Sequence, residues 1–251
     1  MSNQQHFKYS TGVIGFPILF VLLIWFGFWF QLNVFSGFKS FGIRPLTFEG
    51  LRGIIFSPFI HGDIEHLYHN TIPLFVLSMA LFYFYSKISW KIVIYGILLS
   101  GLITWLIGRP ANHIGASGFI YVLVSFIFFK GVFAKHYRLI ALSLIVIFLY
   151  GSMIWYVFPV KDGISWEGHL GGLITGFVFS LIFRKQIAKP HKYVWQQPDY
   201  NEEDDTFMKH FDEDGNFIEH LEEEEPIDEP EALAEEPKII YRYKYRERNN
   251  D

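Results

Sequence analysis

Two residues that could perform nucleophilic catalysis stand at the starts of apolar segments of this chain. Ser117 lies in Gly115-Ala116-Ser117-Gly118, and His169 lies in Trp166-Glu167-Gly168-His169-Leu170-Gly171-Gly172. A serine hydroxyl is a weak nucleophile until a neighbouring base takes its proton, and histidine is the side chain best suited to do so. The residue types therefore indicate a pair in which Ser117 is the nucleophile and His169 the general base.

A second pair, His66 and Asn70, could stabilise the negative charge that such an attack creates. The two residues are four positions apart, so on a helix they share one face. Both side chains can donate hydrogen bonds to an oxyanion, and the backbone amide of Ser117 at a helix N-terminus can add a third donor. We expect Glu167 to point away from His169, so the sequence predicts a Ser-His dyad without a third carboxylate member.

Each of these signals also has an ordinary structural explanation. A serine between glycines in a membrane helix more often serves helix packing. A histidine near the end of an apolar segment usually lies at the membrane interface, which is our expectation for His61, His69 and His113. A zinc site is disfavoured because the His-Glu-x-x-His motif is absent. The chain also has no cysteine, which excludes a disulfide scaffold, a thiol enzyme and cysteine-ligated metal.

The elements that must position these residues are six apolar segments in a chain that is 51% hydrophobic and 18% charged. A helix that crosses about 30 Å of hydrocarbon needs roughly 20 mainly apolar residues. We predict membrane helices at about 13–35, 66–86, 92–108, 115–133, 138–158 and 168–183. The connection 36–65 is long and partly apolar, which is typical of a functional loop. The predicted fold class is an all-α membrane protein, built as a bundle of six transmembrane helices.

Lysine and arginine in the connections predict how the bundle is oriented. Ten of them belong to one face, which includes both ends of the apolar region, and five belong to the other. Connections rich in positive charge stay on the cytoplasmic side, so we predict that both termini are cytoplasmic. The second, fourth and sixth segments then start at the extracytoplasmic face, which brings His66, Ser117 and His169 to one depth.

Small residues on the fourth and sixth segments would let the two helices approach closely. The glycines concerned are Gly115, Gly118, Gly168, Gly172 and Gly176. Helix pairs in membranes use small residues at their contacts because these allow the backbones to come together. We therefore expect these glycines to bring the helix of His169 against the helix of Ser117.

Charge divides the chain into two parts of different composition. Residues 1–198 hold 15 Lys and Arg against five Asp and Glu, whereas residues 199–251 hold six against 20. Blocks of like charge usually remain solvated and disordered. We predict a short cytoplasmic N-terminus at 1–12, a catalytic membrane domain at 13–185, and an acidic, mostly disordered cytoplasmic tail at 186–251.

At these residues the sequence resembles the rhomboid intramembrane serine proteases, over about residues 13–185. The family's Gly-x-Ser-Gly reads Gly115-Ala116-Ser117-Gly118, and its His-x-x-x-Asn reads His66-Leu67-Tyr68-His69-Asn70. Its sixth-helix histidine with trailing glycines reads His169-Leu170-Gly171-Gly172, followed by Gly176.

Three further positions bear on the resemblance. Tyr121 matches a tyrosine that packs against the catalytic imidazole in the family, and His61 matches its upstream histidine. The family's first-loop Trp-Arg pair reads Leu51-Arg52 here, so the usual anchoring tryptophan is replaced.

The resemblance implies a serine endopeptidase that hydrolyses peptide bonds of transmembrane proteins near the extracytoplasmic membrane face. Its expected partners are such substrates and the lipid bilayer, with no nucleic acid, cofactor or metal. The expected location is a bacterial cytoplasmic membrane. One alternative is an inactive rhomboid-like protein that binds or chaperones membrane proteins, which would not need Ser117 and His169. Another is a transporter or channel, which the absence of an inverted repeat and of charges inside the segments disfavours.

Overall fold

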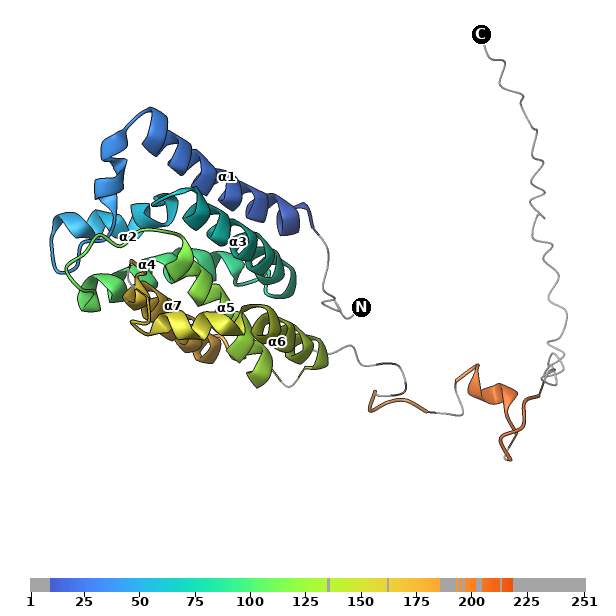
Figure 1. The fold of residues 1–251 in the computed structure, drawn as a ribbon. Coiled ribbons are helices and arrows are strands. Elements are labelled where there is room, and N and C mark those ends of the chain that lie inside the picture. The colour runs from blue at the N-terminus through green and yellow to red at the C-terminus, as the bar shows by residue number, and fades with distance from the viewer. Residues whose placement is uncertain are drawn as a thin grey trace, which may run out of the picture. The chain divides into compact units, whose positions relative to one another are not determined.

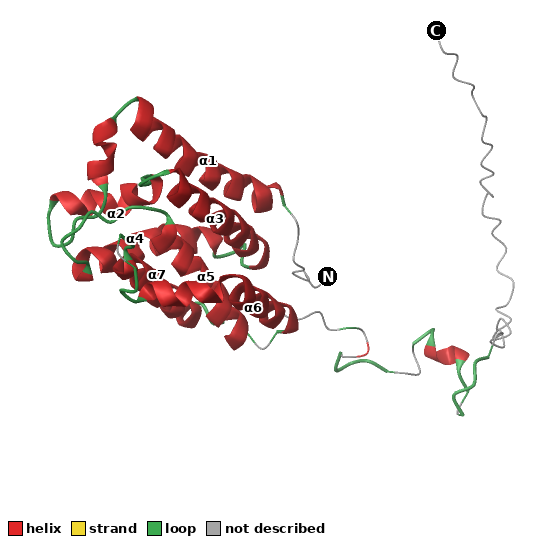
Figure 2. Cartoon of the chain, viewed as in Figure 1, coloured by secondary structure: helices red, strands yellow, loops and turns green. Residues whose placement is uncertain are grey.

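Every regular element that the structure, a computed structural model, describes is a helix (Figure 2). The described residues are 10–134, 136–161, 163–185, 193, 195, 197–201, 205–212 and 214–218. The chain divides into two compact units, 1–191 and 192–251. The predicted N-terminal part at 1–12 lies almost entirely outside the described residues, and so does most of the acidic tail.

One α-helix overlaps each of the six predicted apolar segments. The helices are α1 (Thr11–Asn33), α3 (Ile64–Phe84), α4 (Ser89–Ile107), α5 (Ser117–Phe133), α6 (Tyr137–Tyr150) and α7 (Trp166–Ile182). The sixth begins two residues earlier than predicted because Ser165 caps it, accepting a hydrogen bond from the Gly168 amide at 3.3 Å. The all-helical prediction is therefore confirmed for the described residues of the first unit.

Among the described residues, four helices are long and apolar enough to cross a membrane: α1, α3, α4 and the continuous stretch Tyr137–Val157. The last combines α6 with the 3-10 helix η4 (Gly151–Val157). Helices α5 and α7 have only 17 residues each. Helices of this length and apolar character are those of a multi-pass membrane protein. That six helices span the membrane and that both termini are cytoplasmic remain predictions.

The long first connection folds into short helical turns between α1 and α3. These are η1 (Ser36–Phe41), η2 (Glu49–Arg52), α2 (Gly53–Phe56) and η3 (Ser57–Phe59). The guanidinium carbon of Arg52 lies 3.9 Å from the centre of the Phe41 ring, a cation–π contact. This contact ties η1 to η2 next to Leu51, which stands where the resembled family has a tryptophan.

Helix α5 is the centre of the bundle, packed against α3, α4, α6 and α7 (Figure 1). Its apolar side chains Leu123, Phe126 and Ile127 are fully buried. By contrast, α1 packs mainly on α3 and exposes large apolar side chains such as Leu22 and Phe26 along its outer face. A central helix shielded on all sides can be short, because neighbouring helices rather than lipid surround it.

Lys130 lies inside α5. The orientation prediction had counted it among the positive charges of a connection between helices. Its side chain is fully buried, and its ammonium group donates to the backbone carbonyl of Phe183, the residue that ends α7. The last carbonyls of a helix have no partner within it and carry partial negative charge, so a buried cation is favourable there. Lys130 thus joins the two helices at the end of the bundle opposite Ser117.

The described part of the second unit is a short turn. Asp212 accepts hydrogen bonds from the backbone and side-chain amides of Asn216, and Phe211 pairs with Phe217 across it. Residues 208–210 form the 3-10 helix η7 (Met208–His210). The prediction of a mostly disordered tail at 186–251 falls mainly on residues outside the described ones, and it stays a prediction.

Two glycines of α7, Gly172 and Gly176, face α5 at a distance that leaves no room for a side chain. Gly168 was expected at the same contact, but a Cβ atom there would instead lie 2.9 Å from the hydroxyl oxygen of Ser165 and 3.8 Å from that of Thr104 in α4. A Cβ atom built at Gly172 would lie 2.7 Å from the Cβ of Tyr121 and would overlap the carbonyl oxygen of Gly118. One built at Gly176 would lie 2.7 Å from the backbone nitrogen of Phe126. The predicted close approach of the two helices is therefore present, and it depends on hydrogen atoms at these positions.

We expect Gly172→Ala to lower stability by about 1–3 kcal/mol, because the added methyl group must push α7 away from the α5 backbone. Thermal unfolding in detergent would measure this. Gly15→Ala is the matched control: Gly15 is also in a helix, but nothing lies within 4 Å of the position that an added methyl group would take. The control should be neutral or slightly stabilising, and equal melting temperatures for both variants would contradict the close approach.

Candidate active site

The structure places the side chains of Ser117 and His169 within hydrogen-bond distance. Ser117 is the first residue of α5, and His169 lies in the first turn of α7. The Nε2 atom of His169 is 3.0 Å from the hydroxyl oxygen of Ser117. Because the two helices start side by side, residues 52 positions apart in the sequence meet at one end of the bundle.

The hydrogen bond of its second ring nitrogen fixes the orientation of the His169 ring. Nδ1 lies 2.8 Å from the backbone carbonyl oxygen of Tyr156, in η4. A carbonyl can only accept a hydrogen bond, so Nδ1 carries the proton and Nε2 presents a lone pair to the hydroxyl of Ser117. This is the tautomer in which a histidine can take the proton of a serine.

Tyr121 fixes the same ring from its face. The two rings are nearly parallel, with their centres 4.2 Å apart, and the Tyr121 hydroxyl donates to the carbonyl of Met153 at 2.6 Å. Met153 and Tyr156 both belong to η4, so this short helix holds the tyrosine and the histidine together. His169 is 7% exposed and thus has little freedom to turn away from Ser117.

The turn before α5 brings His66 and Asn70 next to the serine. Gly115 has φ +107°, a left-handed conformation that favours glycine, and its amide donates to the Ser57 carbonyl at 2.9 Å. A Cβ atom at Gly115 would lie 2.7 Å from Nε2 of His66 and 3.7 Å from Nδ2 of Asn70. Both side chains therefore border the space beside Ser117.

The positions of His66 and Asn70 depend on the start of α3. Asp63 caps this helix and accepts a hydrogen bond from the backbone amide of His66 at 2.7 Å. One N–H of Asn70 donates to the His66 carbonyl at 3.2 Å, which leaves its other N–H available. His66 and Asn70 thus offer side-chain donors next to Gly115, two residues before Ser117.

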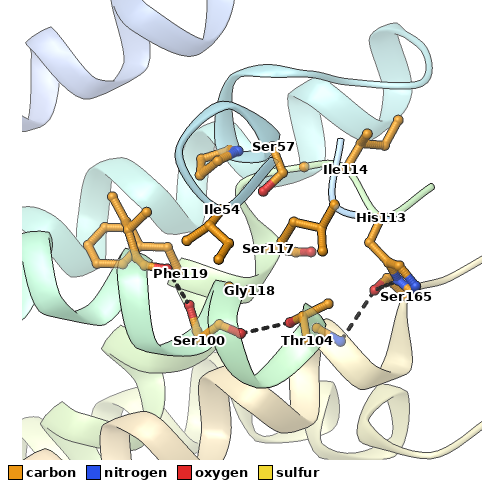
Figure 3. A pocket seen from close by; sticks show the side chains of 16 residues that line it. Ile54, Ser57, Ser100, Thr104, His113, Ile114, Ser117, Gly118, Phe119 and Ser165 are labelled. Carbon is orange, nitrogen blue, oxygen red and sulfur yellow. Dashed lines mark hydrogen bonds between the residues drawn. The ribbon is translucent and has the colours of Figure 1, made fainter. Parts of the chain in front are cut away.

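A small cavity of about 30 Å³ lies beside Ser117, with polar groups in its wall (Figure 3). Its polar lining consists of Ser57, Ser100, Thr104, His113, Ser117 and Ser165. A polar cavity of this size has room for about one water molecule. The cavity is lined by residues of the first connection, α4, the loop before α5, the start of α5 and the start of α7.

Two histidines that we expected at the membrane interface are buried instead. His113 is 4% exposed, and its ring nitrogens contact Ser165 and the Arg109 carbonyl. His61 is fully buried, its ring packed edge-on against His66 with centres 5.1 Å apart. The interfacial expectation is wrong for both residues because the first connection and the loop before α5 fold over the bundle end. His69 is exposed, as expected.

The hydrogen-bond partner of the His169 Nδ1 atom could not be predicted from the sequence. The Tyr156 carbonyl is a backbone group, which every residue type possesses, so no residue pattern indicates it. Glu167 does point away from His169, toward Arg109. Among the described residues, no three His, Asp or Glu side chains gather in a way that could hold a metal ion.

Comparison with known proteins places this site in a family. The model of the Rhomboid domain matches residues 49–186, more than half of the chain. Uncharacterized protein Rv1337 of Mycobacterium tuberculosis and Uncharacterized protein Mb1372 of Mycobacterium bovis are each 42% identical over 147 residues. Uncharacterized protein ML1171 of Mycobacterium leprae is 38% identical over 147 residues. These matches cover 55% of this chain, which spans about three fifths of the length of the curated relatives it matches.

Burial lowers the pKa of His61, in the link before α3, to about 3, with the neighbouring His66 adding to the effect. Its folded pKa thus lies below the unfolded value of about 6.5, so below pH 6.5 the unfolded chain binds a proton that the folded protein does not. We expect His61 to reduce stability as the pH falls from about 6.5 toward 3, by about 2 kcal/mol at pH 5.

Unfolding of wild type, His61→Phe and His69→Gln between pH 5 and 8 would measure this contribution. His61→Phe should lose part of the acid sensitivity whatever its stability at pH 8, and His69→Gln, which alters an exposed histidine, should retain it. Identical pH slopes for wild type and His61→Phe would contradict the predicted role of His61.

Proposed function

The chain belongs to the rhomboid family, and we propose that it is an intramembrane serine protease acting through a dyad of Ser117 and His169. The observation that carries the proposal is the chain of contacts from Ser117 through His169 to the Tyr156 carbonyl. Packing alone does not require a serine hydroxyl aligned on an imidazole whose other nitrogen is already engaged. This alignment is what activates a serine as a nucleophile.

The reaction begins when the Ser117 oxygen attacks the carbonyl carbon of the scissile peptide bond. The serine proton moves to Nε2 of His169, and the substrate carbonyl oxygen becomes a negatively charged oxyanion. We assign His66, Asn70 and the Ser117 amide as the donors to this charge, because both side chains lie next to Gly115, two residues before the serine, and the amide belongs to the first residue of α5. The Tyr156 carbonyl accepts from Nδ1–H throughout and favours the imidazolium that forms.

The tetrahedral intermediate collapses when its carbon–nitrogen bond breaks. His169 gives its proton to the leaving nitrogen, which departs as a free amine, and the acyl group stays on Ser117. A water molecule then attacks the ester while His169 takes one of its protons. Breakage of the ester bond releases a carboxylic acid and restores the Ser117 hydroxyl. The cavity beside Ser117 is a suitable place from which that water could come.

The substrates that we propose are transmembrane proteins cut near the extracytoplasmic face of a bacterial cytoplasmic membrane. Their helices must unwind locally, because every amide within a helix is already hydrogen-bonded and shielded from attack. Sequences rich in weak helix formers at the cleavage site, such as glycine, should therefore be preferred. In the same proposal both termini of the chain are cytoplasmic, and the bilayer supplies the path by which substrates arrive.

Labelling with a fluorophosphonate probe, which reacts with activated serines, tests the dyad. We expect detergent-purified wild type to be labelled, and Ser117→Ala and His169→Ala to remain unlabelled while folding normally. Ser125→Ala is a control, because Ser125 is a buried serine of the same helix that donates to the Leu173 carbonyl at 2.7 Å. Labelling of Ser117→Ala at the wild-type rate would remove Ser117 as the nucleophile.

Removal of one oxyanion donor should slow the reaction without abolishing it. We expect His66→Ala and Asn70→Ala each to lower the rate of substrate cleavage by about 10²-fold or less, because other donors remain in place. His69→Ala serves as the control, since His69 lies on the same helix but is exposed. If both variants cleaved at the wild-type rate, the oxyanion would have to be held by other groups.

A further inference from the structure

A second group of polar side chains joins the loop before Ser117 to the start of α7. Its centre is Glu167, which is fully buried. One carboxylate oxygen accepts a hydrogen bond from the backbone amide of Arg109 at 3.1 Å and lies 3.6 Å from the Arg109 guanidinium. The guanidinium also donates to the Ile164 carbonyl at 2.7 Å, so Arg109 binds both α7 and the residues that lead into it.

His113 links the same two segments a second time. Its Nδ1 atom lies 2.6 Å from the hydroxyl of Ser165, the residue that caps α7 (Figure 3). Its Nε2 atom lies 3.1 Å from the Arg109 carbonyl. The second carboxylate oxygen of Glu167 is 4.0 Å from Nδ1 of His113. This oxygen has no hydrogen-bond partner among the described residues.

Stability alone does not explain a carboxylate in this place. Removing a charge from water is costly, and well-packed apolar residues often serve stability as well as or better than a buried ion pair. What an ion pair with several hydrogen bonds does provide is one defined geometry. Here the groups held in that geometry belong to the two segments that carry the dyad: the loop reaches Ser117 four residues after His113, and α7 reaches His169 two residues after Glu167.

We propose that Glu167, with Arg109 and His113, is a positioning residue that holds Ser117 within reach of His169. Its catalytic consequence rests on the proposed function. Glu167 touches neither the substrate nor the reacting atoms; it sets the relative position of the two segments. A displacement of about 1 Å between a nucleophile and its base is enough to slow a reaction about 10²-fold, so this connection matters more for the rate than for folding.

The experiment compares fluorophosphonate labelling rates of wild type, Glu167→Ala and Glu167→Gln, separating the maximal rate from the probe concentration at half-maximal rate. We expect Glu167→Ala to lower the maximal rate by about tenfold or more, as loss of a hydrogen bond to a charged group implies. Glu167→Gln keeps an oxygen for the Arg109 amide, so its maximal labelling rate should lie between those of wild type and Glu167→Ala. The half-maximal concentration should not change, because the probe does not contact Glu167.

Ser143→Ala is the matched control for a loss of buried hydrogen bonds. Ser143 is buried on α6 and donates to the carbonyls of Phe128 and Leu139, both at 2.9 Å, and it shares no partner with the dyad. Its maximal labelling rate should stay within about twofold of the wild-type rate, even if its melting temperature falls as much as that of Glu167→Ala. A maximal rate that merely follows the melting temperature across all variants would overturn the positioning role.

Hydrogen exchange measures the same connection without any reaction. In Glu167→Ala we expect faster exchange of the amides in residues 108–116 and in the first turn of α7, with unchanged exchange in α6. Unchanged exchange in both regions would overturn the inference. A wild type that is not labelled at all would contradict the proposed function instead, and the exchange comparison would still decide whether Glu167 joins the two segments.

Discussion

The site depends on the contact between α5 and α7. Ser117 and His169 belong to different helices, and a hydrogen bond of 3.0 Å between their side chains requires the two helix starts to lie almost against each other. Glycine is the residue that permits this, because any side chain at Gly172 or Gly176 would meet the α5 backbone. The central place of α5, the burial of α7 and the bridge from Lys130 to the end of α7 all serve to keep this contact.

Within that contact, backbone groups perform tasks that charged side chains perform in many soluble enzymes. The Tyr156 carbonyl orients His169, and the amide of Ser117, the first residue of α5, has no acceptor within its own helix. Backbone dipoles suit an apolar bundle because they orient the imidazole without the desolvation cost of another charge. The one buried carboxylate nearby, Glu167, is held by Arg109 and lies outside the dyad.

The sequence was sufficient to predict that the first unit is helical and that Ser117 and His169 lie close together, because apolar segment length and helix orientation do not depend on fine packing. The glycine spacing of α7 likewise predicted the close helix contact. Three features could not be predicted from the sequence. The Tyr156 carbonyl has no residue signature, the burial of His61 and His113 depends on how the loops fold back, and Lys130 could be placed only once the end of α5 was known.

Cleavage of a transmembrane substrate is the most direct test of the central claim, that Ser117 and His169 hydrolyse peptide bonds within the membrane. Purified protein and a model single-pass substrate would be reconstituted in liposomes, and the products identified by mass spectrometry. We expect two fragments whose masses sum to that of the substrate plus one water, with the cut near the extracytoplasmic end of its helix and no products from Ser117→Ala. An intact substrate with the folded wild type, or equal cleavage by Ser117→Ala, would contradict it.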